Sequence, residues 1–203
     1  MFSFKSKKTE VVEPKFNQDL EIISQMNQEF ALSLDLNETL QTALKVIIQR
    51  ISAKAANVFL INDKKKLFEC IASVGQNYLD EYTIPLTSGV MGKSVTQKKC
   101  IRVGNVRKDV REIAEFYFDL DNKTNFTTYS VLCAPLIAAN ECIGVIHCLN
   151  KKSENNLFEE EDRKLLETLA APAAFAIRNA KMAKEMIEKN KVQKEIEIVG
   201  EIQ

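Results

Sequence analysis

The sequence predicts an α+β fold in which helices lie on both sides of a central antiparallel sheet. Two pairs of strand-like segments, one within residues 55–74 and one within residues 127–149, are each joined by a turn too short for a crossover helix. Amphipathic helical patterns precede the first pair and follow the second. The second pair is apolar with little alternation, which is typical of central strands covered on both faces.

The composition is that of an ordinary globular domain of 203 residues, of which 45% are hydrophobic and 28% charged. This length predicts one domain with extensions, large enough to bury a core without disulfides or metals. Because 28 basic residues balance 28 acidic ones, the chain lacks the positive field that non-specific nucleic-acid binding needs. The opening residues lack the apolar stretch of a signal peptide, and no run is long enough to span a membrane. We therefore expect a cytoplasmic protein with no nucleic-acid or membrane partner.

The cysteines form no C-x-x-C pair, and four of the five lie in apolar, strand-like context. They are Cys70, Cys100, Cys133, Cys142 and Cys148. An odd, scattered set favours reduced, buried thiols over a disulfide framework or a zinc site. We therefore expect neither a metal nor a cofactor.

The start of the chain predicts a lead-in and two helices. Residues 1–16 mix charged residues with a proline and predict a poorly ordered segment. In residues 17–34, apolar side chains recur at three- and four-residue steps, which predicts an amphipathic helix with a narrow apolar stripe. Asp35 and Glu38 have the spacing of a capping box and predict a second helix over residues 36–51.

Four segments rich in β-formers predict two hairpins. Residues 55–61 and 67–74 form the first, across a turn of lysines, and residues 127–137 and 142–149 form the second. After the first hairpin, residues 75–87 read as irregular chain.

Ser88 and Gly89 open a short predicted helix that ends near Gln97. Gly89 lets the backbone pass close to a ligand, and a free helix N-terminus offers unpaired N–H groups with a partial positive charge. That end of a helix suits a phosphate group. The alternative is a plain tight turn with a capping serine, and the pattern alone favours this alternative.

The segment between the two hairpins ends in a predicted strand, helix and turn. Residues 100–103 predict a short strand, and residues 109–118 predict a helix capped by Asp109. Residues 121–125 contain too many turn formers to continue that helix. We expect them to edge a cavity between the two short helices and the sheet, because ligands prefer such a concave, mostly apolar space.

From Glu159 to the end, the pattern is helical. Apolar residues follow heptad spacing at Leu166, Leu169, Ala173, Ala176, Ala180, Ala183 and Ile187. Pro172 removes one backbone hydrogen bond and predicts a kink, at a cost of about 3 kcal/mol unless packing offsets it. We expect this helix to join the helix of residues 17–34 and their symmetry mates in a parallel dimeric bundle. The alternative is a helix that covers only its own sheet.

The second half of the chain carries several short motifs in a fixed order. They are Asp121, Thr124, Phe126 and Thr128, then Leu132-Cys133-x-Pro135, Ile143-Gly144-Val145, Asn150-Lys151, and Phe158 with Asp162. In this combination the chain resembles a GAF domain, above all the GAF domains of cyclic-nucleotide phosphodiesterases and bacterial adenylyl cyclases. The last motif departs from the family at Arg163, where the family has Glu. The resemblance extends over residues 37–180.

The resemblance implies the GAF fold, with a central antiparallel sheet of about six strands, helices on both faces and long terminal helices. Together with the composition and the helical patterns, it divides the chain into the lead-in (1–16), the N-terminal helix (17–34), the GAF domain (35–180) and a C-terminal signalling helix (181–203). The final residues are similar to the segment that enters PP2C-like serine phosphatases, and a diguanylate or adenylyl cyclase output fits nearly as well. We expect the chain itself to be a regulatory domain and not an enzyme, because it shows no carboxylate pair or Cys/His arrangement with recognisable spacing.

The resemblance also implies a binding site for a cyclic purine nucleotide, cyclic AMP (cAMP) in preference to cyclic GMP (cGMP). The positions that line this site in cyclic-nucleotide-binding GAF domains are occupied here by Asn57, Ser73, Val90, Tyr117, Asp121, Thr124, Thr128 and His147. It further implies that Lys151 and Asp162 form a structural salt bridge. The alternatives are a ligand-free dimerisation module and a sensor of another small molecule.

The residue types in this set are compatible with such a ligand. Backbone amides around Val90 and Tyr117 suit the cyclic phosphate, since the set contains no Arg or Lys. Asp121 is expected to accept from a donor edge of the base, with hydroxyls of Thr124 and Thr128 beside it. The structural alternatives are β-propensity for the threonines and a turn cap for Asp121, each about as plausible as the binding role.

The remaining polar members lie on predicted strands. Asn57 and Ser73 both donate and accept, and so suit a purine without choosing strongly between adenine and guanine. His147 is the sole histidine, inside an apolar run, where a satisfied core residue is the usual interpretation. The family resemblance favours a wall of the binding site instead. Binding would order residues 75–92 and 109–128, and the change would reach the outgoing helix through the sheet.

Overall fold

The computed structural model describes residues 36–76, 79, 82–87, 89–106, 108 and 119–200, together with Glu21, Ser24 and Gln28. The lead-in, most of the helix predicted at 17–34 and the helix predicted at 109–118 lie outside these residues, as do Ser88 and Tyr117. The described elements are α2 (Leu36–Ile51), β1 (Ala53–Asn62), β2 (Leu67–Gly75), β3 (Thr83–Pro85), α3 (Gly89–Gln97), β4 (Ile101–Val103), α4 (Asp119–Thr124), β5 (Val131–Ala138), β6 (Glu141–Lys151) and α5 (Glu160–Gly200).

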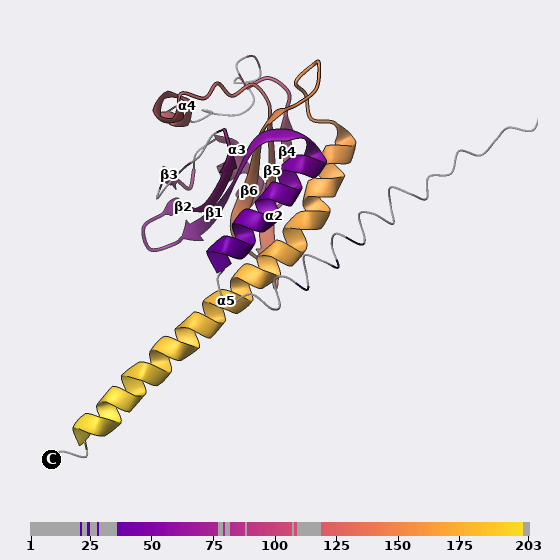
Figure 1. Ribbon diagram of the computed structural model, residues 1–203. Coiled ribbons are helices and arrows are strands. Elements are labelled where there is room, and N and C mark those ends of the chain that lie inside the picture. Colours follow the sequence, from indigo (N-terminus) through magenta and orange to yellow (C-terminus); the bar gives the residue numbers. More distant parts are fainter. Residues whose placement is uncertain are drawn as a thin grey trace, which may run out of the picture.

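Six strands form one antiparallel sheet in the order β3-β2-β1-β6-β5-β4 (Figure 1). The two predicted hairpins are β1–β2 and β5–β6, and they meet at the centre of the sheet because β1 also pairs with β6. The α+β prediction is confirmed. The central strands are buried on both faces, which explains why their sequences are apolar with little alternation.

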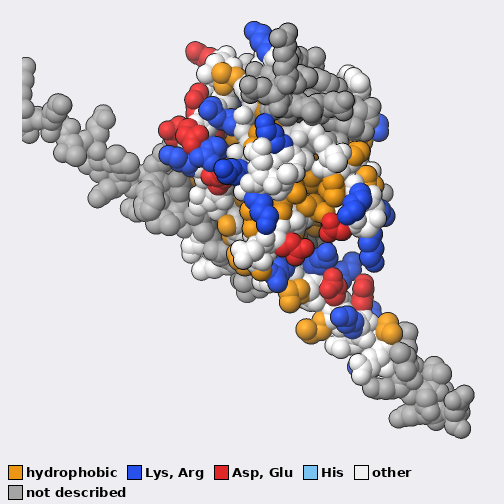
Figure 2. Space-filling model, turned by 180° about the vertical axis from the view of Figure 1, so that it is seen from behind, with side chains coloured by type: hydrophobic (Ala, Val, Ile, Leu, Met, Phe, Trp, Pro, Cys, Tyr) orange, Lys and Arg blue, Asp and Glu red, His pale blue; other side chains and the backbone are white. Residues whose placement is uncertain are grey.

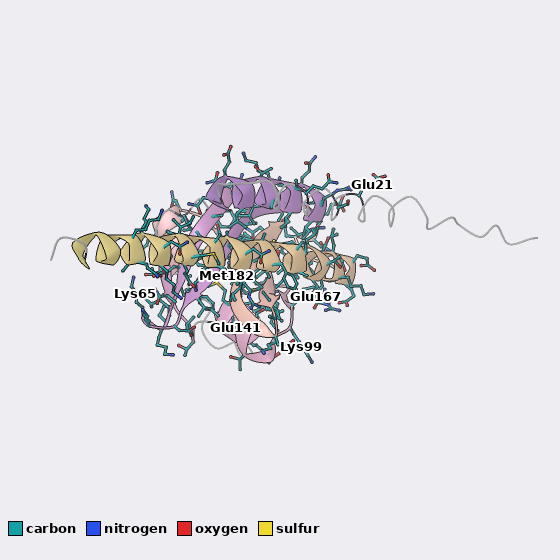
Figure 3. All side chains as sticks on the ribbon, turned by 90° about the horizontal axis from the view of Figure 1, so that it is seen from below. Glu21, Lys65, Lys99, Glu141, Glu167 and Met182 are labelled. Carbon is teal, nitrogen blue, oxygen red and sulfur yellow. The ribbon has the colours of Figure 1, made fainter. Side chains whose placement is uncertain are left out.

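The helices α2 and α5 lie side by side on one face of the sheet (Figures 1 and 3). The apolar stripe of α2 is buried there, with Leu40, Leu44 and Ile47 each about 1% exposed. From α5, Leu166 and Leu169 pack into the same core. This layer holds the framework together, because it buries the apolar stripes of both helices against the four central strands.

The opposite face of the sheet, called the site face below, carries a separate core with α3 packed against β5 and β6. Figure 1 shows α4 on the α3 side of the sheet. Phe59, Phe68 and Val145 from the strands meet Val90 and Met91 of α3 in this core. Alternate residues of each strand therefore serve different cores.

Two predictions between the hairpins are corrected by the structure. Residues 83–85, interpreted as irregular, form the edge strand β3, which pairs with β2. Residues 121–125 were predicted not to be helical, yet α4 includes the first four of them. Turn-forming residues are compatible with so short a helix. Asn125 ends it with a positive φ of 55°, and Phe126 N–H donates to the carbonyl of Asp121 at 3.2 Å.

The strand predicted over residues 127–137 begins four residues late, since β5 starts at Val131. Side chains supply the hydrogen bonds of the missing part. The Asn150 carboxamide oxygen accepts from the backbone of Tyr129 and Ser130, and its nitrogen donates to the carbonyl of Thr127. These backbone groups are satisfied without extending the strand ladder.

The hairpin turn between β5 and β6 consists of Ala139 and Asn140, both with positive φ (48° and 67°). This is the pattern of a two-residue type I′ turn, whose twist matches the strands it joins. Next to it, Gly144 is required by a close approach, because a Cβ there would collide with the carbonyl of Phe59 on β1. The glycine of the Ile143-Gly144-Val145 motif therefore allows β6 to lie at the centre of the sheet.

Helix α5 runs without interruption through Pro172, so the predicted break in backbone hydrogen bonding does not end the helix. Its first half is buried against the sheet, whereas every side chain from Lys181 to Lys194 is exposed. Figures 1 and 2 show this second half extending away from the body of the protein. No helix in the described part of the chain combines the length and apolar character needed to cross a membrane.

Candidate functional site

Three predicted site residues lie next to one another across the site face. Asn57 on β1 pairs with Ser73 on β2 and with His147 on β6. His147 in turn pairs with Cys133 on β5. Directly paired residues of antiparallel strands point to the same face. Ser73, Asn57, His147 and Cys133 therefore form one buried polar row that crosses four strands.

The first two members of the row are hydrogen-bonded to each other. The Ser73 hydroxyl donates to the Asn57 carboxamide oxygen at 2.6 Å, and Ser73 Oγ accepts from the backbone N–H of Leu79 at 2.9 Å. Both side chains are buried. The pair therefore fixes the orientation of the Asn57 amide and connects β1 to the segment that follows β2.

The imidazole of His147 is 2% exposed and packs edge-on against Phe59, with ring centroids 6.4 Å apart and planes inclined by 64°. Loss of hydration on burial lowers the pKa of His147 from 6.5 to about 4, so the ring is neutral at physiological pH. Within the described residues, its Nδ1 is the one fully buried side-chain nitrogen or oxygen without a hydrogen-bond partner. A buried polar atom without a partner is costly, and this one lies in the predicted site.

Helix α3 brings its N-terminus to the site face. It begins at Gly89, whose φ is +48°, and Val90 in its first turn is buried. Gly92 allows the helix to lie close to the preceding turn, because a Cβ there would meet the carbonyl of Leu86 at 2.7 Å. Ser94 Oγ donates to the carbonyls of Lys99 and Cys133 and so ties the helix to β5. The first turn of such a helix carries N–H groups with no acceptor inside the helix.

Asp121 and Thr128 form a pair of their own. The Asp121 carboxylate accepts from the Thr128 backbone N–H at 2.9 Å and from the Thr128 hydroxyl at 2.6 Å, and both side chains are buried. The hydroxyl proton of Thr128 is thus directed at Asp121, and Thr128 can offer a ligand only its oxygen lone pairs.

The other predicted members are Thr124 and Tyr117. Thr124 is half-buried at the end of α4, while Tyr117 lies outside the described residues. Beside Thr124, the ammonium group of Lys123 lies 4.7 Å from the centre of the Tyr82 ring. This cation–π contact joins α4 to the segment before β3. The prediction did not include it, because a lysine in a polar turn carries no sequence signal for such a contact.

Asn150 belongs to the Asn150-Lys151 motif, whose pattern does not indicate what its side chain binds. The three hydrogen bonds of its side chain hold the loop of residues 127–130, which contains Thr128, against the end of β6. The backbone of Asn150 has a positive φ of 55°, a conformation that asparagine adopts more readily than most other residues do. Asn150 therefore positions the Asp121–Thr128 pair relative to the sheet.

The ion pair predicted next to it is present in the structure. Lys151 Nζ lies 2.6 Å from Asp162 Oδ1 and also donates to the carbonyl of Ile51, the last residue of α2. The second carboxylate oxygen of Asp162 accepts from the N–H of Glu159 at the start of α5. These two residues therefore join the end of β6 to both helices of the opposite face. Arg163, which replaces the family's Glu, pairs instead with Glu160 and Glu167 along α5.

The cysteines are all free, and Cys100, Cys133 and Cys148 are buried as predicted, whereas Cys70 and Cys142 are half-buried. The pKa of Cys100 rises to about 12, and the thiols of Cys133 and Cys148 are completely buried with raised pKa values. Such thiols are not thiolates at neutral pH. No group of His, Cys, Asp and Glu within the described residues could hold a metal ion.

Curated relatives of the chain include cyclic-nucleotide phosphodiesterases. The dual 3',5'-cyclic-AMP and -GMP phosphodiesterase 11A of Takifugu rubripes is 26% identical over 179 residues, which cover 83% of this chain and 19% of that protein. The probable 3',5'-cyclic phosphodiesterase pde-5 of Caenorhabditis elegans is 25% identical over 143 residues, covering 65% of this chain and 19% of that protein. The chain thus spans about a fifth of the length of these relatives.

Solved structures share the fold at low sequence identity. The GAF domain of an Acinetobacter phosphoenolpyruvate-protein phosphotransferase superposes with a TM-score of 0.66 at 20% identity, covering 82% of this chain and 96% of that one. Free methionine-R-sulfoxide reductase from Neisseria meningitidis, in complex with its substrate, gives 0.64 at 19% identity, covering 90% and 98%. Identities this low show the fold alone.

The model of the GAF domain family matches residues 33–178, which include every described element from α2 to β6 and the buried half of α5. Gly144 of β6 and the ion pair between β6 and α5 lie within the matched residues. The chain belongs to the GAF domain family.

Proposed function

We propose that this chain is a regulatory sensor domain that binds a cyclic purine nucleotide on its site face, cAMP in preference to cGMP. The observation that carries the proposal is the buried polar row, in which His147 Nδ1 has no hydrogen-bond partner among the described residues. A ligand that supplies one would remove a cost of about 1–3 kcal/mol that the unliganded protein bears. The Takifugu rubripes relative, whose name includes cAMP and cGMP as substrates, supports a cyclic nucleotide as that ligand.

In this proposal the nucleotide lies against the site face, between the sheet, α3 and α4. The N-terminus of α3, around Val90, receives the cyclic phosphate, because its amides donate and its dipole favours an anion. Asp121 accepts from a donor edge of the base. Asn57, Ser73 and His147 face the rest of the base from the sheet.

Two consecutive residues, Asn150 and Lys151, connect this site to α5 through hydrogen bonds of their side chains. Asn150 holds the loop that contains Thr128, and Lys151 binds Asp162 at the start of α5. A movement of the loop on binding would act on Asn150 and, through its neighbour, on α5. We propose that α5 passes the signal, within a homodimer formed through the terminal helices, to a C-terminal output domain such as a PP2C-like serine phosphatase or a nucleotide cyclase. Binding shifts the conformational equilibrium only if the nucleotide prefers one of its states.

A ligand-free dimerisation module is the second candidate, and the exposed second half of α5 favours it. Met182, Met186, Ile187 and Val192 are each more than half exposed there. As a pure dimerisation module, the protein would show no thermal shift with any nucleotide, and its stability would depend on its concentration.

The test is calorimetric titration of the protein with cAMP, cGMP and a cyclic dinucleotide. Alanine at Asp121 would also remove two hydrogen bonds to Thr128, so Asp121→Asn is the better variant, because it keeps an acceptor for the Thr128 amide. We expect Asp121→Asn to weaken cAMP binding by about 10- to 100-fold, as for loss of a hydrogen bond to a charged group. Asp63→Asn, in the exposed turn between β1 and β2, is the matched control and should leave affinity unchanged. Absence of heat and of thermal shift with all three nucleotides would refute the proposal.

A further inference from the structure

The single histidine of the chain occupies the middle of the buried polar row, between Asn57 on β1 and Cys133 on β5. Its ring is 2% exposed, and the edge-on contact with Phe59 restricts its orientation. Restriction of this kind lowers the entropy that a ligand must remove when it binds the ring. His147 is therefore a preorganised hydrogen-bonding group whose Nδ1 lacks a partner in the described part of the protein.

The other members of the polar row are uncharged. Ser73 and Asn57 are neutral, and burial raises the pKa of the Cys133 thiol well above its usual value, so it is neutral as well. Desolvation lowers the pKa of His147 to about 4, because burial disfavours the imidazolium form. An anionic group beside the ring would favour the charged form, so the row suits the uncharged part of a ligand. The phosphate belongs instead at the N-terminus of α3.

A neutral imidazole has one donor and one acceptor nitrogen, and the partner decides which is which. We propose that His147 reads the hydrogen-bonding edge of the bound purine, with Nδ1 accepting from a 6-amino purine and donating to a 6-oxo purine. This inference rests on the proposed function and adds how the base is recognised. The ring holds one proton in both complexes, on Nε2 with the 6-amino base and on Nδ1 with the 6-oxo base.

The consequence is a site that can bind purines with either a 6-amino or a 6-oxo edge. A pocket built around a fixed donor or a fixed acceptor rejects the reversed edge, because a polar group is then left unpaired. A residue that changes tautomer pairs with either edge, so His147 limits the preference of the domain for adenine over other purines. Cyclic AMP and cyclic IMP form a matched pair of probes, because they differ only at the edge that would contact the ring.

The experiment is nitrogen-15 NMR of the imidazole in the full chain at neutral pH, with calorimetry on the same samples. Since the chain has one histidine, the spectrum contains one imidazole and needs no assignment by mutation. We expect cyclic AMP and cyclic IMP to bind within about tenfold of each other. Nδ1 should be an unprotonated, hydrogen-bonded nitrogen with cyclic AMP and a protonated nitrogen with cyclic IMP. Binding of both probes with the same tautomer, or with no change at Nδ1, would overturn this inference and leave the proposed function standing.

Two variants give an independent readout. His147→Gln keeps a neutral group that can donate or accept, and should bind both probes within a few-fold of the wild-type affinity. His147→Leu removes both options and should weaken both by about tenfold, with its melting curve recorded to verify folding. Equal affinities for Gln and Leu variants would exclude His147 as the reading group. If neither probe binds even the wild-type chain, the proposed function fails, and this inference fails with it.

Discussion

At the scale of single residues, His147 makes the stability of the folded protein sensitive to acid. Its pKa is about 4 in the folded state and 6.5 when exposed, so the unfolded chain takes up a proton first as the pH falls. The resulting stability is fully present above the unfolded pKa and is lost as the pH falls towards the folded pKa. The loss amounts to about 3 kcal/mol across that interval.

This prediction is tested by urea denaturation at a series of pH values between the two pKa values. Carboxylates also titrate towards the acid end, so the quantity to compare is the difference between the wild type and His147→Gln, which cannot take up this proton. We expect the advantage of the wild type over the variant to shrink as the pH falls. Parallel curves for the two proteins would mean that His147 is accessible to protons in the folded state.

For the polar residues of the site, the sequence predicted which side chains belong to it but not that they lie next to one another. Ser73, Asn57 and His147 were predicted as a set from family resemblance, and the register of β2, β1 and β6 places them side by side. Their local sequences do not encode this, because each lies on a different strand and adjacency follows from pairing across the sheet. The missing partner of Nδ1 is likewise a property of packing, and no sequence pattern reveals it.

At the scale of the elements, the turn between β5 and β6 has a residue that does not suit its backbone. Ala139 adopts a φ of 48°, a conformation that costs an L-residue about 1–2 kcal/mol and that Asn tolerates better. Ala139→Asn should therefore raise the free energy of unfolding by up to about 1 kcal/mol, measured by chemical denaturation. Ala139→Val is the matched control. A β-branched side chain is least tolerated at a positive φ, so this variant should lower the free energy of unfolding. If valine stabilises the protein, the turn has another conformation.

The ion pair between β6 and α5 provides a second prediction for the elements. Lys151 and Asp162 are mostly buried, with side chains 15% and 11% exposed, and each makes a further hydrogen bond. Removing one charge leaves the other partly desolvated, so Asp162→Asn should cost about 2 kcal/mol of stability. The double variant Lys151→Met with Asp162→Asn should cost less than the two single changes together. Strict additivity in this double-mutant cycle would show that the charges do not interact.

The boundaries of the elements were predicted less well than their existence, for identifiable reasons. β5 begins late because side chains of Asn150 and Asp121 satisfy the backbone of residues 127–130. α4 forms in a segment of turn residues because a positive φ at Asn125 closes it after few residues. β3 is too short to show a strand pattern. For β5 and β3 a contact distant in sequence decided the outcome, whereas α4 is ended by local backbone conformation.

At the scale of the whole molecule, the second half of α5 is a long helix without neighbours in the described structure. Isolated helices are marginal in water, because most helical stability in proteins comes from packing an apolar face. Its exposed apolar residues Met182, Met186 and Ile187 suggest that this face packs against a second copy of the chain (Figure 2). The proposed dimer supplies that packing.

Removal of the residues after Ala180 tests whether the second half of α5 holds the proposed dimer together. We expect the full chain to sediment as a dimer and its melting temperature to rise with protein concentration, because dissociation accompanies unfolding. The shortened chain should sediment as a monomer and melt at a temperature independent of concentration, while it keeps the buried half of α5. A monomeric full chain would contradict both the dimer and the transmission of a signal through paired helices.

By itself, the sequence determined the class of fold, the two hairpins, the helix of residues 36–51, the long C-terminal helix and the family to which the chain belongs. These features follow from periodicity, short turns and motif order, which are local in the chain. The tertiary structure alone decided which polar groups lie side by side on the site face, which of them satisfy one another, and that His147 Nδ1 is left without a partner among the described residues. Burial and hydrogen bonding depend on segments that are far apart in sequence, and these interactions set the chemistry of the site.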